Sequence, residues 1–136
     1  MKKTSAVIAF GLTFITGALL MFIGARFLLS PEVAEQAFGI QTVTGNDFSF
    51  HYIKGIRDLS VGIAILVLLL THTQRGLAIL LLTASFVPVA DFLIVLHAPG
   101  HLTTHLYPHL TAIVLGLVLG CYYLFTAPKS VTHVAL

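Results

Sequence analysis

Residues 54–91 read KGIRDLSVGIAILVLLLTHTQRGLAILLLTASFVPVAD, two long apolar runs joined by a short polar turn. Charged residues lie inside both runs, with Arg57 and Asp58 in the first and Asp91 in the second. Arg57 and Asp91 are about equally far from the turn, so an antiparallel hairpin of two membrane helices brings them to the same depth. Because Arg57 keeps its proton, it needs a carboxylate at that depth, and we expect Asp91 to supply it.

The composition indicates a membrane protein. Of the 136 residues, 57% are hydrophobic and only 9% are charged, whereas about 25% are charged in soluble proteins. Such a chain has too little polar surface to face water, so lipid is the expected solvent. A net charge of +2 with no basic run gives no support for a nucleic-acid partner. The single cysteine, Cys121, excludes an intrachain disulfide and is expected to be buried and inert.

Four apolar runs predict four membrane spans, at about residues 5–29, 52–70, 77–96 and 105–125. Each is long enough to cross a hydrocarbon core of about 30 Å at about 1.5 Å per residue. Pro88 lies inside the third span, where it removes a backbone hydrogen bond and predicts a kink.

A short helix is predicted between the first two spans, at about residues 31–39. Ser30 and Pro31 form a helix-start signal, and Gly39 is a helix-stop signal. Its apolar residues fit a helix lying along the membrane interface. We therefore expect an all-α fold in one domain over residues 1–136. This is an integral membrane four-helix bundle with a short interfacial helix between the first and second spans.

The distribution of basic residues predicts the orientation of this bundle. Four spans place both termini on one side, which carries Lys2, Lys3, Arg75 and Lys129. The cations of the other side lie at or inside helix ends. The positive-inside rule then predicts a multi-pass protein of the cell membrane, a bacterial inner membrane, with both termini in the cytoplasm.

All four spans contribute a polar residue to the outer third of the bundle. These residues are Arg26 in the first span, Arg57 and Asp58 in the second, Asp91 in the third and His109 in the fourth. Charged groups at this depth face the interior, pair with one another or line water, because lipid does not solvate them. Lys54 shares a helix face with Asp58, four residues later. The sequence therefore predicts one polar centre near the outer face.

This centre predicts a site for a membrane lipid or a lipophilic small molecule. Asp91, Asp58 and His109 are the candidate catalytic residues, with either aspartate as the acid or the base and His109 as a proton carrier. Arg26, Arg57 and Lys54 are the candidate ligand-binding residues. If the site is catalytic, isomerisation, hydration or cyclisation fits this set of residues. No cofactor is expected. The one surplus cation suits an anionic head group or a polarised carbonyl, unless Glu32 or Glu35 neutralises it.

Two other functions stay open. A small transporter would need a homodimer with a shared pathway, because four short helices are few for a monomeric carrier. An accessory membrane subunit would use the ionic centre only to hold its helices together.

Histidines recur at intervals of four residues around the last loop. Such spacing on one helix face can chelate a metal, so His101, His105 and His109 form an alternative metal site. Proline and glycine at residues 99–100, together with Pro108, interrupt that face. We therefore expect no metal, and histidines that lie beside lipid head groups.

Several motifs together resemble a known family. They are Gly24-Ala25-Arg26-Phe27, Pro31, Phe38-Gly39, Lys54-Gly55-Ile56-Arg57-Asp58 with Gly62, Pro88-Val89-Ala90-Asp91, and His109-Leu110-Thr111-Ala112. They look like the small four-helix integral membrane proteins of bacteria and fungi catalogued as domain of unknown function 4267. The resemblance covers about residues 11–124 and is most specific in the Lys-Gly-x-Arg-Asp run. It implies the fold and a membrane location, and it implies no known activity.

Overall fold

The computed structural model describes residues 2–128, and all regular structure within them is helical. The helices are α1 (Lys2–Leu29), α2 (Pro31–Phe38), α3 (Ser49–Leu70), α4 (Gln74–Ala84), α5 (Phe86–His97) and α6 (Thr103–Thr126). Only Ser85 separates α4 from α5, so these two form one interrupted rod. The predicted all-α fold and the short helix between the first two long helices are confirmed.

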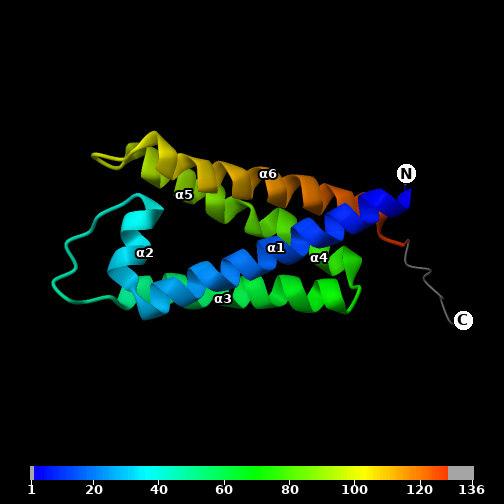
Figure 1. The fold of residues 1–136 in the computed structure, drawn as a ribbon, viewed down its shortest axis with the longest axis horizontal. Helices are drawn as coiled ribbons and strands as arrows, with labels where there is room; N and C mark the ends of the chain where they lie inside the picture. The colour runs from blue at the N-terminus through cyan, green and yellow to red at the C-terminus, as the bar shows by residue number, and fades with distance from the viewer. Residues whose placement is uncertain (1, 129–136) are drawn as a thin grey trace, which may run out of the picture.

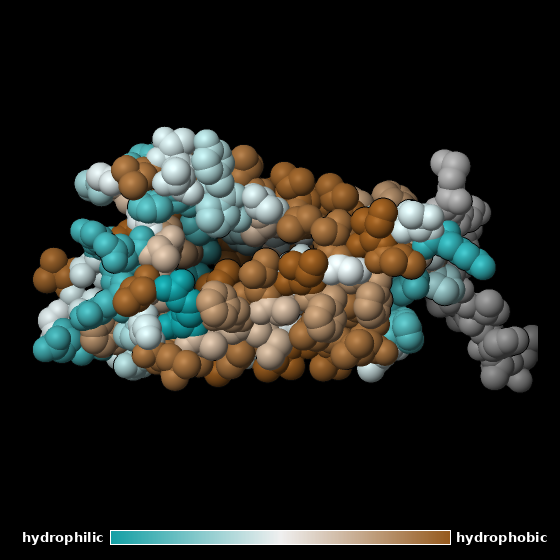
Figure 2. All heavy atoms as spheres, viewed as in Figure 1, coloured by the Kyte–Doolittle hydropathy of each residue, from teal (hydrophilic) through white to brown (hydrophobic). Residues whose placement is uncertain are grey.

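Three helical segments among the described residues are long and apolar enough to cross a membrane. They are Lys3–Leu29, Gln74–His97 and Thr103–Thr126. The surface agrees with this assignment, because hydrophilic residues gather at the two ends of the view in Figure 2 and hydrophobic residues form the band between them. The chain is therefore a multi-pass membrane protein. α3 is also long, with 22 residues. Because it carries three charged residues, its composition alone does not identify it as a span.

The long helices form two layers that diverge towards one end (Figure 1). One layer holds α1 and α3, and the other holds α5 and α6. Near the N terminus the layers meet in a buried core to which α1, α3, α4 and α6 contribute Ala9, Ile65, Leu77 and Leu119 among others. At the opposite end α2 lies across the space between the layers (Figure 1). The fold is therefore closed at one end by its core and bridged at the other by α2.

Glycines allow α1 and α3 to touch along their backbones. A Cβ atom at Gly24 would lie 2.5 Å from the Leu59 nitrogen, and one at Gly62 would lie 2.7 Å from the Gly17 oxygen. Such distances are too short for any side chain, so only glycine permits this approach. Gly55 and Gly62 on α3 both lie directly against α1.

Pro88 interrupts the rod formed by α4 and α5 one turn before its own position. Its ring removes one backbone N–H and crowds the carbonyl four residues earlier, so the helix breaks at Ser85. The buried Ser85 hydroxyl donates to the Leu81 carbonyl at 2.7 Å, so this polar side chain at the break has a hydrogen-bond partner. By contrast, Pro108 lies inside α6 without ending it. The last long helix therefore begins before Pro108 and includes His105.

The helix signals around α2 are only partly confirmed. α2 begins at Pro31 and ends at Gly39, whose φ of 99° is the left-handed conformation that glycine adopts readily. Ser30 occupies the N-cap position, but its side chain makes no capping hydrogen bond. The start of α2 therefore depends on Pro31 rather than on the Ser30 hydroxyl.

Candidate functional site

A cavity of about 230 Å³ lies between the two layers, at the end bridged by α2. All six predicted catalytic and ligand-binding residues line it: Arg26, Lys54, Arg57, Asp58, Asp91 and His109. Apolar side chains such as Leu20, Val61 and Ala112 form most of the remaining wall. In Figure 2 the surface is hollowed between the layers beside the hydrophilic end. The cavity is therefore amphipathic, with charged groups from several helices and an apolar body.

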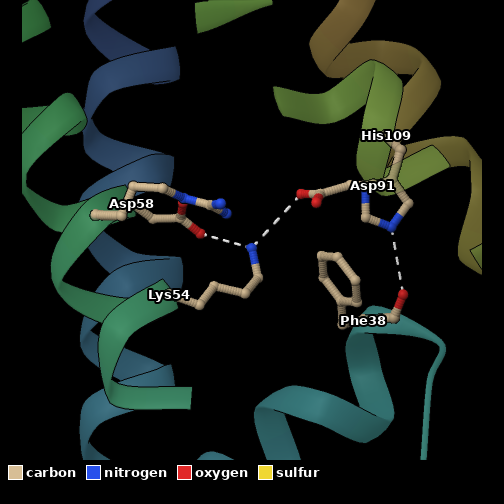
Figure 3. Close-up of polar contacts among 6 residues, drawn as sticks. Phe38, Lys54, Asp58, Asp91 and His109 are labelled. Carbon is tan, nitrogen blue, oxygen red and sulfur yellow. Dashed lines mark hydrogen bonds and ion pairs between the residues drawn. The ribbon is translucent and has the colours of Figure 1, made fainter. Parts of the chain in front are cut away.

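Lys54 connects the two layers across this cavity. Its Nζ lies 2.8 Å from Asp58 Oδ2 and 3.6 Å from Asp91 Oδ2 (Figure 3). The same nitrogen lies 4.5 Å from the centre of the Phe38 ring and 5.0 Å from that of Phe27. Two carboxylates and two aromatic faces thus surround one ammonium group.

The expected pairing of Arg57 with Asp91 is wrong. Arg57 Nε donates to Asp58 Oδ1 at 3.1 Å, and the cation beside Asp91 is Lys54. Each helical residue turns the side-chain direction by about 100°, so residues at one depth need not face one way. Lys54 and Asp58 lie on the face towards α5, whereas 43% of the Arg57 side chain is exposed.

Asp91 and His109 line the opposite wall, on α5 and α6. Asp91 accepts no hydrogen bond from any described residue, since its one ion pair, to Lys54, is longer than a hydrogen bond. His109 is buried, and its Nε2 lies 3.3 Å from the Phe38 carbonyl oxygen (Figure 3). Because a carbonyl only accepts, Nε2 carries a proton in this contact, and Nδ1 is an acceptor whenever the ring is neutral. This wall therefore has one carboxylate without a hydrogen-bond donor, on Asp91, and one imidazole nitrogen, Nδ1 of His109, without a partner among the described residues.

Arg26 has no acidic partner among the described residues. It lines the cavity from α1 and is partly buried. Its guanidinium lies over the Phe22 ring at 5.9 Å, a contact within the same helix. The cavity therefore contains one cation that no carboxylate neutralises.

The sequence did not reveal the buried pair of Glu35 and His51. His51 Nε2 lies 2.8 Å from Glu35 Oε2, and Glu35 also accepts a hydrogen bond from the Thr42 backbone. The pair joins α2 to α3 outside the cavity, so Glu35 does not neutralise the polar centre. Phe38 was also missed as a site residue, although the Phe38-Gly39 motif drew attention to it. Its ring contacts both Lys54 and the His109 ring, whose centre lies 4.6 Å away.

The alternative metal site at His101, His105 and His109 does not form. Within residues 2–128 no three histidine, cysteine or acidic side chains come together as metal ligands do. His101 contacts the backbone of Ala98, and His105 accepts from the backbone of Leu102. The break at residues 98–102 keeps His101 in a loop, whereas His109 turns inward.

Cys121 is exposed, contrary to expectation. The apolar run around Cys121 does not by itself indicate burial in a protein core. On a membrane helix, apolar residues also cover the side that faces lipid.

Comparison with known proteins gives one match. The family model described as "Domain of unknown function (DUF4267)" matches residues 17–123. The match includes every residue that lines the charged part of the cavity, and it confirms the resemblance seen in the motifs. No curated protein matches the chain, and no solved structure matches it either.

Proposed function

Because the chain belongs to the DUF4267 family, whose function is unknown, we propose a function from the cavity itself. The protein is a four-span membrane protein that binds a lipophilic small molecule between its two helical layers. It acts on this molecule by acid/base chemistry, with Asp91 as the proton acceptor and His109 as a proton carrier. The cavity opens towards the outer leaflet, and both termini are cytoplasmic.

The length and the packing of α3 support its role as the fourth span. Its 22 residues extend about 33 Å at about 1.5 Å per residue, enough for a hydrocarbon core of about 30 Å. The charges of Lys54, which is partly buried, and of Asp58, which is buried, pair with each other and line the cavity. The glycine contacts hold it against α1, an apolar span.

The observation that carries the proposal is an amphipathic cavity with unsatisfied charged groups in its wall. In a purely structural ionic centre, paired charges and side chains fill the space, because unpaired charge is unfavourable in lipid. Here Asp91 has no hydrogen-bond partner and Arg26 has no carboxylate among the described residues. A volume of about 230 Å³ is below the range of about 300–1,000 Å³ for drug-sized ligands. The ligand is therefore small, or part of its length lies in the bilayer.

Photolabelling tests whether the cavity binds an apolar molecule. A neutral ten-carbon alcohol carrying a diazirine is added to the protein in phosphatidylcholine nanodiscs and crosslinked by light. We expect mass spectrometry to find the label on peptides that line the cavity. Ala112→Phe should block labelling, because Ala112 lines the cavity. Val114→Phe is the matched control, because Val114 is exposed on the same helix. Equal labelling of both variants and the wild type would contradict the proposal.

The acid/base step is tested with Asp91→Asn, which keeps the shape of the side chain and removes its basicity. Lipid extracts from cells that express the wild type should contain a converted species that is absent with Asp91→Asn. Asp47→Asn is the control, since Asp47 is an exposed carboxylate outside the cavity. If Asp91→Asn loses its folded structure in detergent, Asp91 is a structural residue and the acid/base proposal is wrong.

A further inference from the structure

We propose that the cavity selects amphiphiles with one anionic head, a carboxylate or a phosphate, and that Arg26 binds this head. This inference rests on the proposed binding function and names the class of ligand. The argument starts from the charges in the cavity wall and then from every other acid of the chain.

The charges in the wall do not cancel. Three cations, Arg26, Lys54 and Arg57, line the cavity with two carboxylates, Asp58 and Asp91. Lys54 contacts both carboxylates, and Arg57 contacts Asp58. Asp58 is therefore held by two cations of α3, Asp91 has only the longer ion pair to Lys54 at 3.6 Å, and the cation with no carboxylate beside it is Arg26 on α1.

No other acidic side chain among residues 2–128 neutralises Arg26. The sequence has five acidic residues, and the three outside the cavity wall are Glu32, Glu35 and Asp47. Glu35 is held by His51 and by the Thr42 backbone. Asp47 accepts two hydrogen bonds from Ser49. Glu32 is exposed and borders a separate hollow beside Pro31 and Tyr52.

An unpaired guanidinium at this depth needs an anion from elsewhere. A charged side chain inside a membrane is unfavourable by a few kcal/mol, and a bound anion removes most of that cost. The planar guanidinium can donate two parallel hydrogen bonds to a carboxylate or phosphate. The apolar wall formed by residues such as Leu20, Val61 and Ala112 then accepts the tail. Both halves of an anionic amphiphile thus have a complementary surface.

The geometry also orients the ligand for chemistry. Arg26 belongs to the layer of α1 and α3, whereas Asp91 and His109 belong to the layer of α5 and α6. A ligand held by its head at Arg26 therefore lies in the cavity that Asp91 and His109 also line. The arginine is thus a binding residue for the head, and it leaves the proton-transfer groups free.

The test compares the diazirine alcohol with the matching ten-carbon carboxylic acid in the same nanodiscs. We expect the acid to bind the wild type at least about tenfold more tightly, as a charge-assisted hydrogen bond predicts. Arg26→Gln should remove this preference, so that this variant binds the acid no more tightly than the alcohol. Arg26→Lys should restore part of the preference, and Arg75→Gln should have no effect, because Arg75 is exposed and does not line the cavity.

The outcomes separate this inference from the proposed function. Equal binding of acid and alcohol by the wild type overturns the anionic-head inference and leaves the proposed function standing. Binding of neither compound overturns the proposed function. If Arg26→Gln unfolds more easily than the wild type, Arg26 is a structural residue and the inference is also overturned.

Two sources of the anionic head are distinguished by changing the bilayer. If the head belongs to a membrane lipid, phosphatidylglycerol displaces the carboxylic acid, and native mass spectrometry finds this lipid on the wild type but not on Arg26→Gln. If the head belongs to a free amphiphile, the acid stays bound in phosphatidylglycerol nanodiscs. Either result supports an anionic head at Arg26.

Discussion

Lys54 has more polar and aromatic partners than any other cation of the cavity. Its ammonium is the charged contact between α3 and α5, and its neighbours Asp58 and Asp91 are both partly or fully buried. Removal of this one charge leaves two carboxylates facing each other in a region of low dielectric, where their repulsion is strong. The position of Lys54 therefore matters both for stability and for the charge of the cavity.

We expect Lys54→Met to lower the free energy of unfolding by about 2–3 kcal/mol, less than the about 3–5 kcal/mol of a fully buried pair. The loss is smaller because Arg57 still contacts Asp58. Denaturant unfolding in detergent micelles measures it. Adding Asp91→Asn to Lys54→Met should recover part of the stability, because it removes the carboxylate that Lys54→Met leaves unpaired.

Arg57→Met is the comparison for this prediction. Because 43% of the Arg57 side chain is exposed, we expect its loss to cost less than about 1 kcal/mol. A larger loss for Arg57→Met than for Lys54→Met would show that Arg57, and not Lys54, is the partner of Asp91.

Asp47 provides a pH-dependent contribution at the start of α3. Its carboxylate accepts hydrogen bonds from the hydroxyl and the backbone N–H of Ser49, and these hold the pKa of Asp47 below its ordinary value. A carboxyl group with a lowered pKa stabilises the folded state fully above its unfolded pKa, and this stabilisation is lost as the pH falls through the folded pKa. Asp47→Ala should therefore be less stable than the wild type at neutral pH, and the difference should narrow in acid. Unfolding titrations over this pH range measure the effect, and a difference that does not vary with pH would contradict it.

The packing of α1 on α3 sets the position of two walls of the cavity. Gly24 faces the backbone of α3 near Gly55 and Leu59, only a short distance along α1 from Arg26. Any side chain at Gly24 must push the two helices apart, and a displacement there also moves Lys54 and Asp58. The glycine contact is thus a condition for the charge arrangement of the cavity.

Gly24→Ala should lower the free energy of unfolding by about 1–3 kcal/mol, as overpacking does elsewhere. The added Cβ would lie 2.5 Å from the Leu59 nitrogen, which belongs to the backbone and cannot turn away. Gly11→Ala is a matched control in the same helix, because nothing lies within 4 Å of its added Cβ. It should be neutral or stabilising by up to about 1 kcal/mol, the helix propensity difference. Equal effects of the two variants would contradict close packing at Gly24.

The sequence predicted the helices and the gathering of six polar residues around one centre, because both follow from distance along the chain. Apolar run lengths must match the bilayer, and the break signals around Pro31 and Gly39 mark α2. The sequence did not predict which groups would meet. The choice of Lys54 over Arg57, like the pair of Glu35 and His51, depends on how each helix is rotated about its own axis. That rotation is fixed by packing between helices, here through the glycines of α1 and α3.

The two ends of the helical bundle differ in how closely the layers pack. Near the N terminus α1, α3, α4 and α6 meet in the apolar core, and at the other end the layers diverge around the cavity.

If α3 crosses the bilayer, the loop before it and the turn after it lie on opposite sides. Val43 is fully exposed in that loop, and Thr73 is exposed in that turn. The side on which these two residues lie therefore tests the fourth span.

Thiol labelling of single-cysteine variants in a Cys121→Ser background makes this measurement. A membrane-impermeant maleimide added to intact bacterial spheroplasts should label Val43→Cys and Leu102→Cys, which lie in the two loops at the α2 end. Thr4→Cys and Thr73→Cys should react only after the membrane is permeabilised. Labelling of Val43→Cys and Thr73→Cys from the same side would mean that α3 lies on the surface and that the chain has three spans. The reverse labelling pattern would keep four spans and invert the orientation. The basic residues near Thr4 and Thr73 would then lie outside, against the positive-inside rule.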